Sequence, residues 1–390
     1  MEQDEIKDQE SLMGWLKVQS RTDAVAIYHR SALRVASIWF AAMDEPWARE
    51  GKLTSLPVLR HLLTSGVAAV NPTSEIKAAA SAFSISFPLS DSDSTAYASA
   101  SASAFAASAF AANASFSPSS PGGAVFDLAV TAAERYANAS SDFWEQFRKD
   151  ARCLQHGDDL LSLPLWSIPQ PDWFKRADAD GRAIWANDDL AVWSFWTRWW
   201  DGVLSGKQIN WDLQRAIALI PDADWQQGPA HIAAIIARLE EQFDLRAQIA
   251  ELRANLRAAE TQAVSNSAST AHRSHNHPPE LVETPVAIRR ELTVVYAALD
   301  DAEAELAKPN PDNSVLKRAG LAILSAAKAI TLYCASLTDT VLKKAAEEVG
   351  STGAKWAIRA SVAYYGLQTE PLQFLGKALV DFAKKAWLGG

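Results

Sequence analysis

The chain has 390 residues, of which 48% are apolar and 21% are charged, so it holds enough apolar material for one to three globular folding units. Its formal net charge of −9 argues against a general nucleic-acid-binding protein, because such proteins need a basic surface that displaces phosphate counterions. The two cysteines, Cys153 and Cys334, lie far apart, which excludes a disulfide framework and is typical of a reducing cytoplasm. We therefore expect a cytoplasmic globular protein that binds no nucleic acid.

The N-terminal part of the sequence predicts two helices. Residues 1–5 are acidic and lack the basic and then apolar pattern of a secretory signal, so we expect no export signal. Apolar residues recur at helical spacing over residues 5–43, which predicts a long helix. A shorter helix is expected over residues 56–70, where Asn71 and Pro72 end it.

A low-complexity stretch of alanine and serine occupies residues 78–116, with Asp91 and Asp93 as its two charges. Apolar and polar residues alternate over residues 83–89, which is typical of a strand. Alanine, however, is the strongest helix former, and the aspartate and serine residues that precede residue 95 are suitable N-caps. We predict a helix over residues 95–114 that packs closely, because its side chains are small.

The helical spacing of apolar residues returns over residues 124–154. Residues 157–229 then hold nine of the 15 tryptophans and are broken by prolines into short pieces. Trp193, Trp196 and Trp200 are spaced so that they share one helix face. The tryptophans can serve as large core residues or line an aromatic recognition pocket, and we expect the core role.

A long helix is expected over residues 230–263. Its second half carries a heptad-like apolar series that suits either self-association or packing inside one chain: Leu245, Ile249, Leu252 and Leu256. We favour internal packing, because about two heptads are marginal for an isolated coiled coil. A homo-oligomer formed through these residues is the alternative.

A stretch rich in serine, histidine and proline at residues 264–280 is the best candidate for a linker. It would separate an N-terminal helical domain, residues 1–263, from a C-terminal helical module, residues 281–390. No alternation of strands and helices typical of a parallel sheet occurs. The sequence therefore predicts an all-α protein with a tryptophan-rich subdomain at residues 157–229.

The chain contains several short motifs: Asp142-Phe143-Trp144, Leu163-Pro164-Leu165-Trp166, Pro171-Asp172-Trp173, Trp193-Ser194-Phe195-Trp196, Ile220-Pro221-Asp222 and Trp225-Gln226-Gln227-Gly228-Pro229-Ala230. The linker segment Ser274-His275-Asn276-His277-Pro278-Pro279-Glu280 is similar to a Gly-His-Asn-Asn-Pro-Pro-Glu element, from which it departs at Ser274 and His277. Together they resemble a family of uncharacterised α-proteobacterial helical proteins, in which that element joins an N-terminal region to a C-terminal helical module. The resemblance implies a helical fold and the linker, and it implies no activity.

We expect no catalytic site, no cofactor and no metal. His272, His275 and His277 lie in a linker-like stretch without a nearby cysteine, which favours a solvated segment over a metal site. Cys153 and His156 lie one helical turn apart, but a catalytic pair also needs an orienting third group and a cleft. The sequence therefore predicts that the protein is not an enzyme.

The C-terminal end carries the strongest functional signal, since residues 349–390 hold five basic and two acidic residues. A helix over residues 371–388 would place apolar residues on one side, lysines largely elsewhere and a tryptophan near its end: Leu372, Leu375, Leu379 and Phe382; Lys377, Lys384 and Lys385; Trp387. This pattern is typical of a helix that contacts a membrane surface or a partner's groove, and equally of a terminal helix docked on its own bundle.

A second apolar stretch, residues 319–337, has Lys328 as its single charge. A lysine at the centre of a bilayer costs roughly 2.5–3.5 kcal/mol, so we expect insertion only after a rearrangement.

These patterns predict a non-enzymatic effector whose C-terminal module acts on a membrane or a protein partner and is held in check by the acidic N-terminal domain. Such a protein would be cytoplasmic and would become peripheral to a membrane on activation, and a toxin or defence role is a conjecture. The alternative is a structural or adaptor protein that recognises another macromolecule, with its C-terminal helix docked in its own bundle. An enzyme with an unrecognised site ranks third.

Overall fold

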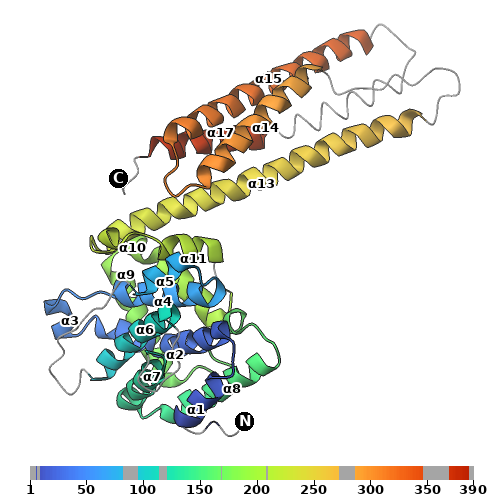
Figure 1. Cartoon of the computed structure of the whole chain (residues 1–390). Helices are drawn as coiled ribbons and strands as arrows, with labels where there is room; N and C mark the ends of the chain where they lie inside the picture. The colour runs from blue at the N-terminus through green and yellow to red at the C-terminus, as the bar shows by residue number, and fades with distance from the viewer. Residues whose placement is uncertain are drawn as a thin grey trace. The chain divides into compact units, whose positions relative to one another are not determined.

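A computed structural model describes residues 6, 9–81, 95–113, 121–167, 169–207, 210–271, 286–345 and 369–385. Within these ranges the chain forms helices and no strand, which confirms the predicted all-α class. The chain divides into two compact units, Met1–Leu239 and Glu240–Gly390 (Figure 1).

The N-terminal unit is built around a central helix, α2, which is buried over nearly its whole length. Helix α2 packs against α4, α6, α7, α8 and α9. The elements of this unit are α1 (Gln9–Leu16), α2 (Arg21–Ala42), α3 (Pro46–Glu50), α4 (Leu56–Val70), α5 (Ser74–Ser81), α6 (Thr95–Asn113), α7 (Pro121–Ala137), α8 (Ser140–Gln155), the 3-10 turn η3 (Leu160–Ser162), α9 (Asp172–Asp188), α10 (Leu190–Ser205), α11 (Trp211–Ala218) and α12 (Asp222–Trp225).

Two helices that the sequence predicts as continuous are each divided. The helix expected over residues 5–43 is split into α1 and α2, because the Ser20 side chain accepts a hydrogen bond of 3.1 Å from the backbone N–H of Asp23 and caps α2. The helix expected over residues 124–154 is split into α7 and α8 at Asn138, whose φ of 51° is incompatible with a continuing helix. The helical spacing of apolar residues therefore predicts which face of each helix is buried, but it does not predict where a helix ends.

The alanine- and serine-rich helix α6 spans Thr95–Asn113 and confirms the prediction of a helix over residues 95–114. It packs against α2, α4, α5 and α7. The hydroxyls of Ser103 and Ser108 donate to backbone carbonyls of α7 and α5 at 3.1 and 3.0 Å, so the buried serines are paired. The alternative strand over residues 83–89 lies outside the described residues.

The tryptophans of residues 157–229 lie mainly in the core. The three that were expected on one helix face, Trp193, Trp196 and Trp200, are at most 3% exposed, and Trp199 is 1% exposed. Three of these four indole N–H groups donate to side-chain oxygens: Trp193 to Asp188 (2.8 Å), Trp199 to Gln214 (2.8 Å) and Trp200 to Asp178 (2.6 Å). These contacts support the core role over a recognition pocket.

The C-terminal unit contains most of α13 (Pro229–Ala271), α14 (Val286–Leu306), α15 (Asn313–Ala345) and α17 (Thr369–Lys384). The boundary between the units falls inside α13, earlier than the predicted boundary at residue 263, because the apolar residues of α13 from Leu245 onward belong to the second core. The predicted linker at residues 264–280 is helical as far as Ala271, and its remainder lies outside the described residues.

The core of the C-terminal unit combines apolar stripes from all four helices. Leu245, Ile249, Leu252 and Leu256 are at most 4% exposed and belong to one cluster with apolar residues of the other three helices: Leu292, Val295 and Leu299 of α14; Leu316, Ile323 and Ile330 of α15; Leu375, Leu379 and Phe382 of α17. The heptad series of α13 therefore packs inside one chain, and in this fold it is not exposed for self-association.

Helices α15 and α17 touch at their backbones. A Cβ atom on Gly320 would lie 2.7 Å from the carbonyl oxygen of Gly376, and a Cβ atom on Gly376 would lie 2.9 Å from that of Gly320. Both distances are shorter than van der Waals contact, so this crossing requires glycine on both helices.

We predict that Gly320→Leu destabilises the C-terminal unit by about 3 kcal/mol, because a side chain at the crossing forces α15 and α17 apart. Urea unfolding followed by circular dichroism measures the loss. Ala335→Leu, at an exposed position of α15, is the matched control and should change stability by less than about 0.5 kcal/mol. Equal effects of the two substitutions would contradict the close crossing.

Candidate functional site

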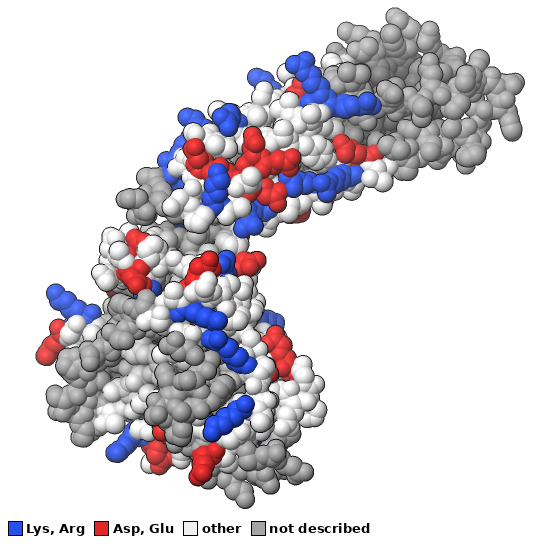
Figure 2. Space-filling model, in the orientation of Figure 1, with Lys and Arg blue, Asp and Glu red and all other residues white. Residues whose placement is uncertain are grey.

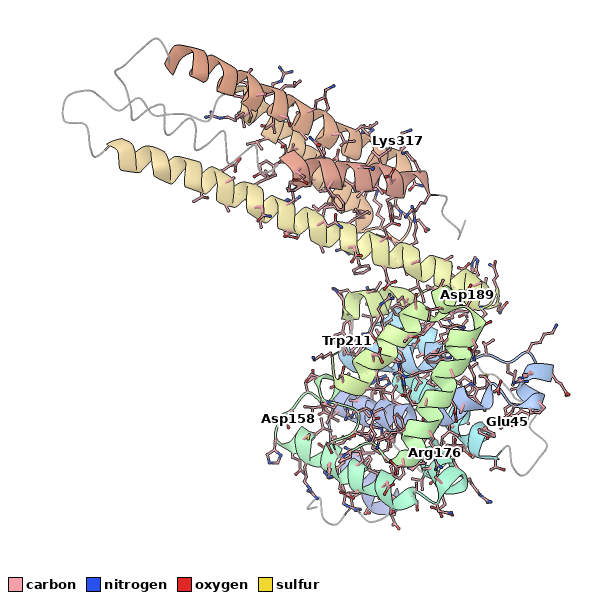
Figure 3. All side chains as sticks on the ribbon, turned by 180° about the vertical axis from the view of Figure 1, so that it is seen from behind. Glu45, Asp158, Arg176, Asp189, Trp211 and Lys317 are labelled. Atoms are coloured by element: carbon pink, nitrogen blue, oxygen red, sulfur yellow. The ribbon has the colours of Figure 1, made fainter. Side chains whose placement is uncertain are left out.

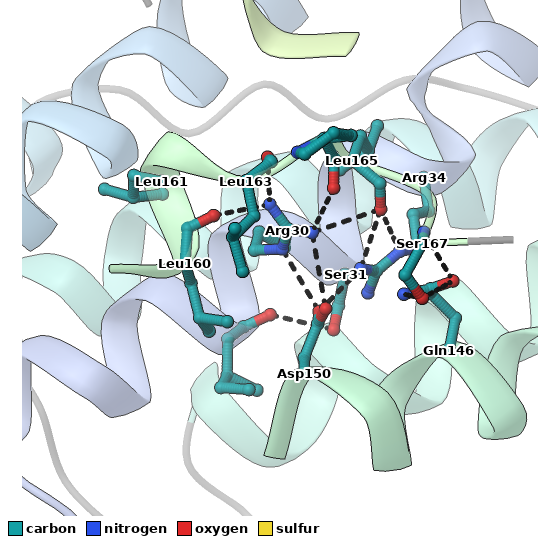
Figure 4. Close-up of polar contacts among 12 residues, drawn as sticks. Arg30, Ser31, Arg34, Gln146, Asp150, Leu160, Leu161, Leu163, Leu165 and Ser167 are labelled. Atoms are coloured by element: carbon teal, nitrogen blue, oxygen red, sulfur yellow. Dashed lines mark hydrogen bonds and ion pairs between the residues drawn. The ribbon is translucent and has the colours of Figure 1, made fainter. Parts of the chain in front are cut away.

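A buried group of charges lies in the N-terminal unit, between α2, α8 and the segment of residues 160–165 (Figure 4). Arg30 and Arg34 of α2 share the carboxylate of Asp150 of α8, at 3.1 Å for Nε of Arg30 and 2.5 Å for Nη2 of Arg34. The three side chains are 3%, 0% and 4% exposed. We call these three residues the arginine clamp.

The arginine clamp holds the backbone of the segment that contains the Leu163-Pro164-Leu165-Trp166 motif. The guanidinium of Arg30 donates to four carbonyl oxygens: those of Leu160 (2.6 Å), Leu163 (3.0 Å), Pro164 (2.7 Å) and Leu165 (3.2 Å). Arg34 donates to the Leu165 carbonyl as well, at 2.9 Å from Nη2. Because this irregular segment forms few backbone hydrogen bonds of its own, the two guanidinium groups satisfy its carbonyl oxygens instead.

The electrostatics of the arginine clamp favour a structural role. Burial lowers the pKa of Arg34 to about 10, with Asp150 opposing the shift and Arg30 adding to it, so the Arg34 guanidinium stays charged at neutral pH. The excess positive charge is offset by carbonyl dipoles and by the Trp166 ring, whose centroid lies 5.7 Å from the guanidinium carbon of Arg34. Since none of the three side chains reaches solvent, the clamp binds its own chain.

No motif or apolar pattern in the sequence predicts a site at these three residues. Arg30 and Arg34 lie four residues apart on one face of α2, and no acidic residue of α2 lies three or four positions from either of them. That isolation is the signal that could have indicated a buried ion pair with another helix. Their partner Asp150 could not be found in the same way, because it lies 116 residues from Arg34.

The surroundings of Cys153 and His156 do not favour a nucleophilic pair. Burial, followed by the charges of Asp150 and Asp158, raises the pKa of the Cys153 thiol and so disfavours the reactive thiolate. Nδ1 of His156 lies 2.7 Å from the carbonyl oxygen of Arg152, at the exposed end of α8. Within the described ranges no three histidine, cysteine or acidic side chains are placed to hold a metal ion. His272, His275 and His277 lie outside those ranges.

The residues predicted for membrane or partner contact are divided between the core and the surface. The apolar residues Leu372, Leu375, Leu379 and Phe382 are at most 2% exposed, because they fill the core against α13, α14 and α15. Lys377 is exposed, Lys384 pairs with Asp381 at 2.9 Å, and Lys385 pairs with Glu241 of α13 at 2.7 Å. Trp387 lies outside the described residues.

The surface of α15 and α17 retains other apolar residues that the sequence analysis did not single out. Phe374, Leu332 and Leu321 are 66%, 61% and 51% exposed. Lys317 lies on α15 near its N-terminal end (Figure 3). Acidic and basic side chains are interleaved on the visible face of the unit (Figure 2).

Comparisons of the chain with models of protein families, with curated proteins and with solved structures find no match. The resemblance to α-proteobacterial helical proteins therefore stays a prediction.

We predict that Asp150→Asn destabilises the N-terminal unit by about 3–5 kcal/mol, because it leaves two buried guanidinium groups without a carboxylate. The shift is measured by urea unfolding followed by tryptophan fluorescence. Glu145→Gln, which removes an exposed carboxylate from the same helix, is the control and should cost less than about 1 kcal/mol. A similar loss of stability in both variants would contradict the proposed contribution of the arginine clamp to the stability of the N-terminal unit.

Proposed function

We propose that the protein is a non-enzymatic adaptor that recognises another macromolecule with its C-terminal helix docked in its own bundle. The observation that carries this proposal is the burial of Leu372, Leu375, Leu379 and Phe382 in a core shared with three other helices. Because these four residues are covered by their own bundle, α17 does not offer its amphipathic face to a bilayer or to a partner's groove.

A partner would meet the outer face of the C-terminal unit. The exposed side chains of α15 and α17 include the apolar residues Phe374, Leu321 and Leu332 and the lysines Lys377 and Lys328. Mixed apolar and basic surface of this kind suits a protein partner with apolar and acidic groups.

A second candidate is the effector that acts on a membrane after α17 is released. The observation that favours it is α15, whose residues Asn313–Ser336 are long and apolar enough to cross a bilayer, with a mean hydropathy of 1.4 and 33% of the apolar window buried. Core helices of soluble proteins satisfy the same length and hydropathy criteria. In this candidate the restraint on α17 would come from α13, α14 and α15 of its own unit, in place of the acidic N-terminal domain.

The two candidates predict opposite results in co-flotation with anionic vesicles of phosphatidylcholine and phosphatidylglycerol. For the adaptor, the wild-type chain and Gly320→Leu both stay in the vesicle-free fraction at neutral pH. For the effector, Gly320→Leu floats with the vesicles, because the substitution weakens the docking of α17 without changing the sequence of that helix.

The triple variant Gly320→Leu/Leu375→Glu/Phe382→Glu separates specific membrane binding from adsorption of a loosened chain. Flotation of Gly320→Leu that is lost in the triple variant would overturn the adaptor proposal. Flotation of the wild-type chain would overturn it as well.

A further inference from the structure

Two histidines are buried where α2, α4 and α6 meet. His29 of α2 and His61 of α4 are 1% and 2% exposed, and these three helices pack against one another in pairs. In the folded chain an imidazole at such a position is neutral, because protonation would place a positive charge in an apolar interface.

The neighbours of His29 favour the neutral tautomer that carries its proton on Nδ1. The Ser65 hydroxyl donates to the carbonyl oxygen of Leu62 at 2.9 Å, so its oxygen accepts from Nδ1–H of His29 at 2.9 Å. The other edge of the ring faces the Cα of Gly66, where an added Cβ would lie 3.0 Å from Nε2. The ring is therefore enclosed by the backbone of α4, and a proton added at Nε2 would meet the Gly66 position.

His61 lies on α4 one helical turn before Ser65. Its ring packs edge-on against Phe105 of α6, with ring centroids 4.5 Å apart. Burial, with a further contribution from Arg60, lowers the pKa of His61 to about 3. Burial and the charge of Arg30 lower the pKa of His29 to about 3 in the same way.

The charged groups on the surrounding helices do not offset the cost of protonating His29 or His61. Helix α6 carries no charged residue, and α4 carries Arg60, which pairs with Asp222. On α2, Arg30 and Arg34 belong to the arginine clamp with Asp150. Two further helices, α5 and α11, also pack here. Their charged residues are Glu75 and Lys77 of α5 and Asp212 and Arg215 of α11, and Glu75 pairs with Arg215 at 3.2 Å. The charged residues of α7 and α9 are exposed or half-buried.

We propose that the interface of α2, α4 and α6 is an acid-sensitive switch, in which protonation of His29 and His61 opens the N-terminal unit while the C-terminal unit stays folded. We expect the two units to respond differently to acid because the described residues of the C-terminal unit contain no histidine. This inference is independent of whether the protein is an adaptor or a membrane effector.

The direction of the effect follows from linkage. Both histidines have an ordinary pKa near 6.5 when unfolded and a lower one when folded, so the unfolded chain binds more protons between these values. Their contribution to stability is complete above pH 6.5 and is lost progressively as the pH falls toward 3. Between pH 7.5 and 5.0 the unfolding equilibrium constant should rise about thirtyfold for each histidine and about a thousandfold for both.

Urea unfolding of the full-length chain tests this, with tryptophan fluorescence as the readout, because 13 of the 15 tryptophans precede residue 240. We expect the thousandfold rise for the wild-type chain and for the control His156→Asn, which changes an exposed histidine. His29→Gln/His61→Gln should lose most of the rise. Equal pH dependence in the wild-type chain and the double variant would overturn the proposal.

A measurement on the wild-type chain covers the case in which the double variant does not fold. In NMR spectra of protein labelled with ¹³C-histidine, assigned with single variants, the signals of His29 and His61 should stay those of neutral imidazole down to pH 5. Titration of either ring near pH 6.5 in the folded chain would overturn the proposal.

Discussion

The packing of the C-terminal unit depends on the contact of two helix backbones at Gly320 and Gly376. With hydrogen as the side chain on both sides, α15 and α17 approach closely enough for Leu375, Leu379 and Phe382 to enter the core of the bundle. Each of these side chains contributes about 1.5–3 kcal/mol when it is fully buried, so release of α17 would expose a large apolar surface at considerable cost. The crossing therefore decides whether this helix is a part of the fold or a free amphipathic segment.

The N-terminal unit solves a different problem, which is how to fix an irregular segment against a bundle of short helices. The guanidinium groups of Arg30 and Arg34 donate hydrogen bonds to four carbonyl oxygens of residues 160–165, and the carboxylate of Asp150 pairs with both of them. The same central helix α2 carries His29, which is enclosed by α4. Buried polar groups of this kind contribute specificity to the packing and make it sensitive to any change in their charge.

The all-α class, the alanine-rich helix and the apolar faces were predictable because helical spacing of apolar residues reflects burial directly. The breaks at Ser20 and Asn138 were not, since they depend on a cap and on one positive φ angle. The amphipathic pattern of Leu372, Leu375, Leu379 and Phe382 was read correctly as one face, but a pattern does not state what covers that face. Helices α13, α14 and α15 pack against that face. The arginine clamp likewise joins residues that lie more than 100 positions apart, and no local sequence pattern encodes such a contact.

Hydrogen exchange of the full-length chain at neutral pH tests the docked state of α17 most directly. If α17 is part of the core, the backbone amides around Leu375, Leu379 and Phe382 will be protected to a degree similar to those of α15 around Ile323 and Ile330, because both helices are exposed by the same unfolding event. Exchange of the α17 amides within seconds, beside amides of α15 that stay protected, would contradict a docked C-terminal helix.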